Sequence, residues 1–196
     1  GEKVADIKSS TSRDIAFYGY KNVPVDQRAG ALEAAKKDDR LSVEDIEKLQ
    51  SHFKTSNSTS TKLINSELTK MDTMIDDGVL PDVSLINDYE ATGVALNKPE
   101  LVLKAQKLKA KIALVSSLNN MTPLQIEDFI TTTRADINSQ SNKPGEPTGT
   151  STALYDQLKT AENYLAKLKT DLEKDPIMAV AKRGTFQIET IDFQEF

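Results

Sequence analysis

The chain has 196 residues, of which 38% are hydrophobic and 28% charged, a composition that favours one or two folded units over a disordered chain. The lack of cysteine excludes disulfides, thiol nucleophiles and cysteine-ligated zinc or iron–sulfur centres. A net charge of −5 disfavours general nucleic-acid binding, and no apolar run approaches the roughly 18 residues that a membrane-spanning helix needs. Glycines and prolines fall mostly at the ends of predicted helices, which indicates an all-α protein. We expect an antiparallel helical bundle with extended N- and C-terminal arms.

Residues 1–22 are predicted to form the extended N-terminal arm. The segment is polar and serine-rich up to an aromatic cluster at residues 15–20, where the apolar residues lack helical spacing. Residues 23–96 are predicted to form a subdomain of short helices. The first of these opens after Pro24 and carries a small, alanine-rich apolar face that contributes little burial.

Start and stop signals divide the rest of this subdomain. Ser42 is a predicted N-cap, with Asp45 three residues later, and the helix that it starts is expected to run through Phe53. The Ser, Thr and Asn residues at 55–61 are predicted to form a loop. The next helix is expected to end at Gly78, because glycine adopts the left-handed C-cap conformation without steric cost. A shorter helix follows.

Residues 97–184 are predicted to form the helical bundle. Its first helix is marked by a stripe of apolar residues at helical spacing: Leu101, Ala105, Leu108, Ile112 and Val115. Thr122 then N-caps a second helix, with Pro123 at the first position and Gln125 placed to complete a capping box. The two helices are therefore expected to fold back on each other as an antiparallel hairpin.

A flexible linker at residues 139–150, rich in Pro, Gly, Ser and Thr, is predicted to join this hairpin to a third long helix. That helix carries the most regular apolar pattern in the chain, a heptad seam made by Leu154, Leu158, Ala161, Leu165, Leu168 and Leu172. The seam is shorter than an independent coiled coil needs, so packing on the hairpin is favoured over a homo-oligomer, which stays open. Asp175 is predicted to cap a short helix, and residues 185–196 to form an extended tail.

No residue pattern predicts a catalytic, cofactor-binding or metal site. His52, the single histidine, has no partner in a recognisable motif and is interpreted as a surface residue near a helix C-terminus, where the helix dipole favours a cation. The acidic pairs at 38–39 and 76–77 lack the alternating ligand spacing of a calcium loop and are interpreted as solvated helix ends. We therefore expect no enzymatic activity and no cofactor.

Two sets of residues are candidates for contacts with a partner. The leucines of the seam, Leu154, Leu158, Leu165, Leu168 and Leu172, form the first set. The second set is the basic face of Lys104, Lys107 and Lys111, for which a solvated surface opposite the apolar stripe is favoured because no aromatic residues are interleaved for base stacking.

The second half of the chain combines the stapled turn at 121–125, a helix end at 134–137, a loose linker, a leucine-rich helix and the run at 172–179. This order, within residues 81–193, resembles the helical regions of large phage and prophage virion proteins. The resemblance implies a location in the virion, and some such proteins carry a lytic transglycosylase domain. The transglycosylase signature is a catalytic Glu followed directly by Ser, and no Glu in this sequence is followed by Ser. The resemblance therefore implies a non-catalytic segment.

The leading hypothesis is a non-enzymatic structural or interaction module of a phage-type virion-associated protein, whose partners are other proteins or neighbouring domains of a longer chain. Gly1 without a preceding Met agrees with a processed start or a piece of such a chain. The alternative is a bacterial secreted or surface helical protein that binds a protein partner. A third hypothesis is a small hydrolase, for which His52 and the aspartates at 76–77 are the best candidates.

Overall fold

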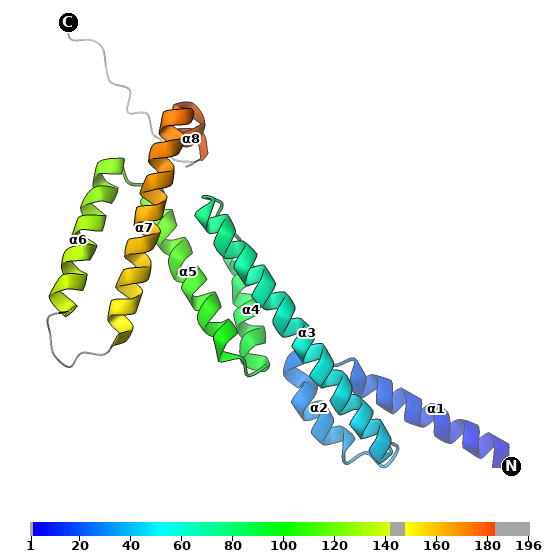
Figure 1. Cartoon of the computed structure of the whole chain (residues 1–196). Helices are drawn as coiled ribbons and strands as arrows, with labels where there is room; N and C mark the ends of the chain where they lie inside the picture. Colours follow the sequence, from blue (N-terminus) through cyan, green and yellow to red (C-terminus); the bar gives the residue numbers. More distant parts are fainter. Residues whose placement is uncertain (1, 142–147, 183–196) are drawn as a thin grey trace, which may run out of the picture. The chain divides into compact units, whose positions relative to one another are not determined.

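The structure is a computed structural model that describes residues 2–141 and 148–182. Every regular element in these two ranges is a helix (Figure 1). In chain order they are α1 (Glu2–Lys21), the short 3-10 helix η1 (Val25–Gln27), α2 (Arg28–Ala35), α3 (Val43–Asp76), α4 (Val83–Ala95), α5 (Pro99–Asn119), α6 (Pro123–Ser141), α7 (Thr148–Lys174) and α8 (Pro176–Lys182). The predicted all-α class is confirmed.

The helices form two compact units. Unit 1 comprises Gly1–Thr69 and Val83–Gln106, and unit 2 comprises Lys70–Asp82 and Lys107–Phe196. Helices α3 and α5 therefore each contribute residues to both units. Each unit has a hydrophobic core of its own.

Helix α1 replaces the extended arm predicted for residues 1–22, so that prediction is wrong. Ala16 is buried in the core of unit 1 beside Ala35, Leu41 and Leu49, and Tyr20 packs against this core. These contacts stabilise a helix that the serine-rich sequence favours only weakly, since packing of one apolar face supplies most of the stability of a helix in a protein.

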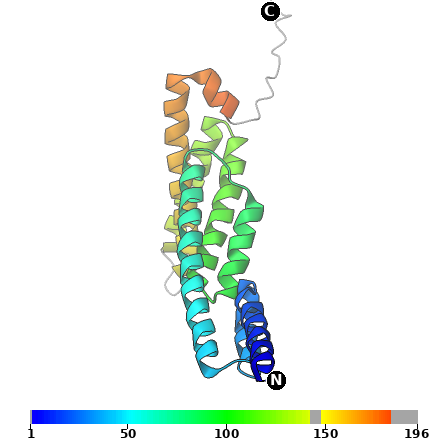
Figure 2. The same ribbon diagram turned by 90° about the vertical axis from the view of Figure 1, so that its right-hand side faces the viewer.

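The predicted loop at 55–61 is also wrong, because α3 continues through it without a break (Figure 2). The hydroxyl of Thr61 donates to the carbonyl of Asn57 at 2.8 Å, and the hydroxyl of Thr59 donates to the carbonyl of Thr55 at 3.1 Å. These side chains bond within the helix instead of diverting its backbone. Buried Ile64 and Leu68 follow at helical spacing and pack the continuation.

Two helices end with a residue in the left-handed conformation. Gly78 has a φ of 79° and donates to the carbonyl of Ile75, while Val79 donates to the carbonyl of Met74, both at 2.9 Å. This Schellman motif confirms the predicted stop at Gly78. After α4, Asn97 has a φ of 53°, and the amide of Lys98 closes the same pattern on the carbonyl of residue 93 at 2.9 Å.

Unit 2 takes in the part of the predicted bundle that begins at residue 107, together with the end of α3, whereas the start of α5 with Leu101 and Ala105 belongs to unit 1. Helices α6 and α7 lie side by side and antiparallel (Figure 1). The core is made by Leu118 of α5, Ile126 and Ile130 of α6, and Ala161, Leu165 and Leu168 of α7. The capping box is confirmed, because the amide of Thr122 donates to Oε1 of Gln125 at 2.8 Å and the amide of Gln125 donates to Oγ1 of Thr122 at 3.3 Å.

The predicted linker at 139–150 lies partly inside helices, since α6 extends to Ser141 and α7 begins at Thr148. The six residues between them, and the predicted tail at 185–196, lie outside the described residues. The predicted cap of the last helix is confirmed by a 3.0 Å hydrogen bond from the amide of Met178 to Oδ1 of Asp175.

Candidate functional site

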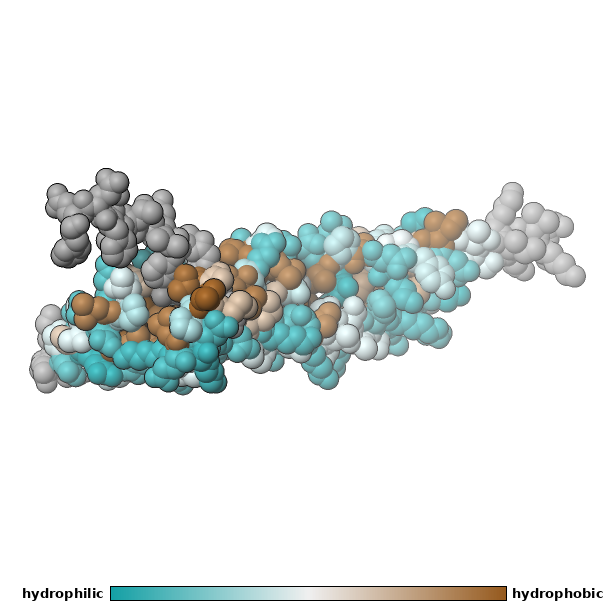
Figure 3. Space-filling model, turned by 90° about the horizontal axis from the view of Figure 1, so that it is seen from above, coloured by the Kyte–Doolittle hydropathy of each residue, from teal (hydrophilic) through white to brown (hydrophobic). Residues whose placement is uncertain are grey.

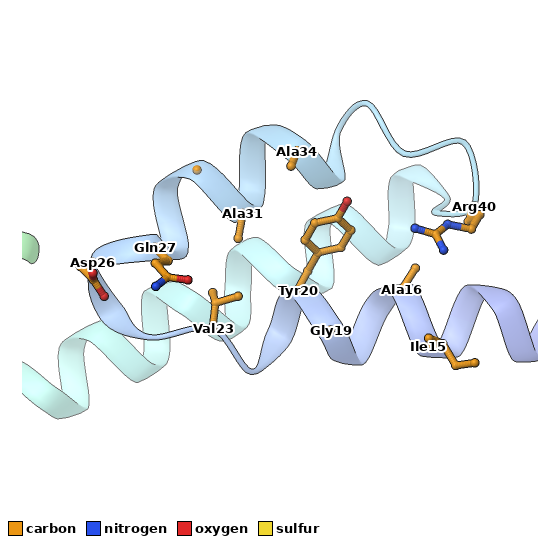
Figure 4. A pocket seen from close by; sticks show the side chains of 11 residues that line it. Ile15, Ala16, Gly19, Tyr20, Val23, Asp26, Gln27, Ala31, Ala34 and Arg40 are labelled. Atoms are coloured by element: carbon orange, nitrogen blue, oxygen red, sulfur yellow. The ribbon is translucent and has the colours of Figure 1, made fainter.

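An open groove with a volume of about 680 Å³ runs between α1 and α2 in unit 1 (Figure 4). Small residues from both helices line part of it: Ala16 and Gly19 from α1, and Gly30, Ala31 and Ala34 from α2. Ile15 stands at one edge with 66% of its surface exposed. Larger side chains, among them Tyr20, Val23 and Gln27, line the rest of the groove.

One end of the groove carries a polar cluster built around Asp38. The Arg40 side chain donates to its carboxylate from Nε at 2.8 Å and from Nη2 at 2.7 Å, and the Tyr20 hydroxyl donates at 3.1 Å. The hydrogen bonds from the Arg40 side chain and backbone hold the pKa of Asp38 well below its usual range. Burial, together with the bond to Asp38, raises the pKa of Tyr20. Asp38 is therefore held ionised and Tyr20 protonated near neutral pH, which disfavours proton transfer by either group.

The opposite end of the groove carries Asp26 and Gln27 (Figure 4). Within the described part of the chain, Asp26 has no hydrogen-bond or ion-pair partner, and it is exposed. The groove thus has an unpaired acidic group at one end and a guanidinium at the other. Because Asp38 neutralises that guanidinium, a partner that fills the groove meets an uncompensated charge only at the Asp26 end.

The three predicted lysines all have partners on neighbouring helices, and two of them make these contacts at the exposed surface. Lys104 donates to Oδ1 of Asn65 at 2.8 Å, and Lys107 pairs with Asp156 of α7 at 3.1 Å. Lys111 pairs with Asp72 and Asp76 of α3 and is only 18% exposed. Lys111 therefore joins α5 to α3 in a largely covered position, while Lys104 and Lys107 make their contacts at the surface, where such pairs contribute little to stability.

The leucine seam lies mostly inside unit 2. Leu165 and Leu168 are buried, and Leu158 and Leu172 pack against the same core, while Leu154 is half-buried. Intramolecular packing, the favoured prediction, accounts for these contacts. A homo-oligomer through the seam stays a prediction, and it would compete with this packing.

The remaining candidates have structural surroundings. His52 lies in the first third of α3 with its ring 5.9 Å from that of Phe53, so the predicted position near a helix C-terminus is wrong. Asp76 pairs with Lys111, and Asp77 pairs with Lys167 at 3.1 Å. In the described ranges, no three His, Cys, Asp or Glu side chains gather as a metal site would require.

Other apolar side chains are exposed on both units. They include Ile177 at 80% and Leu124 at 67%. On the face drawn in Figure 3, apolar residues in brown alternate with hydrophilic residues in teal. None of the helices in the described part is both long enough and apolar enough to cross a membrane.

Sequence reasoning missed the groove, because one of its walls was assigned to an extended arm. The signal that could have indicated it is a pair of glycines, Gly19 and Gly30, in segments that the structure shows to be helical. The chain matches no protein-family model, and comparison with curated proteins and with solved structures gives no match either.

Proposed function

We propose that this chain is a non-enzymatic structural and interaction module of a phage-type virion-associated protein. The observation that carries the proposal is the open groove between α1 and α2 in unit 1, which is lined in part by small side chains. Its ionisable groups Asp38 and Arg40 are bonded to each other. Such a surface suits the close approach of another backbone better than it suits bond-breaking chemistry.

The virion assignment rests on the sequence resemblance in residues 81–193. The helical geometry is compatible with it, since the turn at 121–125 and the leucine-rich helix belong to one packed unit. In this proposal the apolar stripes serve the cores, and the groove and polar faces meet neighbouring proteins or neighbouring domains.

Two measurements test the proposal. Purified chain incubated with peptidoglycan sacculi is expected to release no soluble muropeptides, with a lysozyme digest as positive control. Muropeptide release by the chain would contradict the non-enzymatic assignment.

The neighbours of the parent gene are expected to encode capsid and tail proteins. Secretion genes in their place would favour the alternative, a secreted or surface protein.

A further inference from the structure

Unit 2 carries a group of exposed apolar side chains at one of its ends. They come from three separate segments: Val79 and Leu80 follow α3, Leu124 lies in the first turn of α6, and Ile177 and Met178 lie in α8. Each of these residues has between 39% and 80% of its surface exposed. We call these five residues the apolar end of unit 2.

Contacts within unit 2 bring the three segments to the same end. Nζ of Lys167 in α7 lies 3.1 Å from Oδ1 of Asp77, just after α3. Nζ of Lys169, also in α7, lies 2.6 Å from Oε1 of Glu127 near the start of α6. Helix α8 follows α7 directly and buries Ala179. The end of α3, the start of α6 and α8 therefore surround the C-terminal part of α7 (Figure 1).

The sequence that follows α8 is rich in large apolar residues. Residues 183–196, here called the C-terminal segment, lie outside the described residues, and five of them are large and apolar: Phe186, Ile188, Ile191, Phe193 and Phe196. Three of the six phenylalanines of the chain are among them. Apolar and polar positions alternate at 186–189 and at 191–194. Such a segment gains free energy when its apolar side chains leave water for an apolar surface.

We propose that the C-terminal segment binds the apolar end of unit 2 in the same chain. Its fourteen residues span up to about 46 Å when extended, whereas the axes of packed helices lie only about 8–10 Å apart. The segment can therefore reach from α8 to the start of α6 and the end of α3. This inference goes beyond the proposed function and does not depend on the virion assignment.

Covalent attachment favours this occupant over a separate molecule. The C-terminal segment begins six residues after Ile177, which belongs to the surface that it would cover. An attached segment has an effective concentration on the order of millimolar at a surface within its reach. Even a weak apolar contact is therefore occupied in the intact chain, while a second copy or another protein has to compete with it.

Oxidation of Met178 in the full chain is the first test. Hydrogen peroxide converts an accessible methionine to its sulfoxide, and peptide mass spectrometry measures the rate. The double variant Phe186→Ser/Phe193→Ser is expected to be oxidised at Met178 roughly threefold faster than the natural chain, because the cover is lost. The double variant Gln187→Ser/Gln194→Ser changes the next polar positions and is the matched control, which is expected to keep the natural rate.

Leu124→Asp tests the part of the apolar end that is distant from Met178 in the sequence. Leu124 follows Pro123, the first residue of α6, and an acidic residue in the first turn of a helix is favourable, so the variant is expected to fold. A charge there disfavours the apolar segment, and the oxidation rate of Met178 is expected to rise about twofold. Val43→Asp, at an exposed apolar position in the first turn of α3 in unit 1, is the control.

Circular dichroism reports whether each variant is folded. The proposal is overturned if Met178 is oxidised at the same rate in the natural chain and in the folded phenylalanine variant. It is also overturned if protection of Met178 increases with protein concentration, because the surface would then be covered by a second copy. An unchanged rate in Leu124→Asp contradicts the proposed contact with the start of α6.

Discussion

The guanidinium of Arg13 on α1 donates two hydrogen bonds to the carboxylate of Asp45 at the start of α3, from Nε at 2.7 Å and from Nη2 at 2.5 Å. The amide and hydroxyl of Ser42 donate to Oδ2 of the same carboxylate at 3.0 and 2.7 Å. Asp45 is only 3% exposed. One buried carboxylate thus caps α3 and also holds α1 against it.

Asp45→Asn is expected to lower the free energy of unfolding by about 2 kcal/mol, because charge-assisted bonds to a buried carboxylate are lost. Urea unfolding followed by circular dichroism measures the change. Asp39→Asn, at an exposed neighbouring position, is the control and is expected to change stability little. Equal stability of the two variants would contradict the role assigned to Asp45.

Acid is expected to weaken unit 1. The hydrogen bond from Arg13 is the largest cause that holds the pKa of Asp45 below its usual range, and the Arg40 side chain does the same for Asp38. Because the folded-state pKa values are depressed, this stability is complete above the unfolded value of about 3.9 and is lost as pH falls further. Thermal unfolding between pH 7 and pH 2 tests this. The Asp45→Asn variant is expected to give a shallower decline.

Lys111 is expected to contribute stability that is lost as the pH rises, whereas the stability from Asp45 and Asp38 is lost as the pH falls. Burial lowers its pKa, but hydrogen bonds to Asp72 and Asp76 outweigh burial, and the net shift is upward. A raised folded-state pKa gives stability that is complete below the unfolded value of about 10.4 and is lost as pH rises through the folded value. Lys111→Gln is expected to cost about 1–2 kcal/mol at neutral pH. Lys159→Gln, an exposed lysine of α7, is the control in urea unfolding.

The glycines are expected to separate into two classes under substitution by alanine. Gly78→Ala should cost about 1 kcal/mol because of its positive φ. Gly93→Ala should cost about 1–3 kcal/mol because its Cβ would crowd Leu101 and Val102. Gly19→Ala and Gly30→Ala should each gain about 0.5–1 kcal/mol. Unfolding at a concentration where the chain is monomeric tests all four, and destabilisation by the last two would show a contact within the chain.

The seam is expected to respond unevenly to truncation. Leu165→Ala should cost about 2–5 kcal/mol, since a buried leucine leaves a cavity in the core of unit 2. Leu154→Ala should cost less than about 1 kcal/mol, because Leu154 is half-buried near the start of α7. Equal losses from the two variants, by urea unfolding, would show that the seam packs differently.

Local signals in the sequence were enough to predict three of the helix ends. The capping boxes at Ser42 and Thr122 and the stop at Gly78 each depend on residues within a few positions, so they can be read without tertiary structure. The spacing of the leucine seam likewise placed Leu165 and Leu168 in a core, because burial follows helical periodicity.

Long-range partners could not be predicted in this way. The helix α1 depends on Asp45, which lies 32 residues after Arg13, and nothing near Arg13 in the sequence identifies that carboxylate. The helical run through 55–61 depends on threonine hydroxyls that bond to the preceding turn, whereas the same residues are typical of loops. The groove was missed with α1, because a surface between two helices requires both helices to be placed.

The division of α3 and α5 between the two units has a practical consequence. The chain passes from one unit to the other between residues 69 and 70 and between residues 106 and 107, in both cases within a continuous helix. A truncation at either point would cut through a hydrogen-bonded helix. Buried residues close to the cut, such as Met71 and Leu108, would then lie in a short piece of helix without the rest of that helix. Isolated halves are therefore expected to aggregate, and biochemical work on this protein calls for the undivided polypeptide.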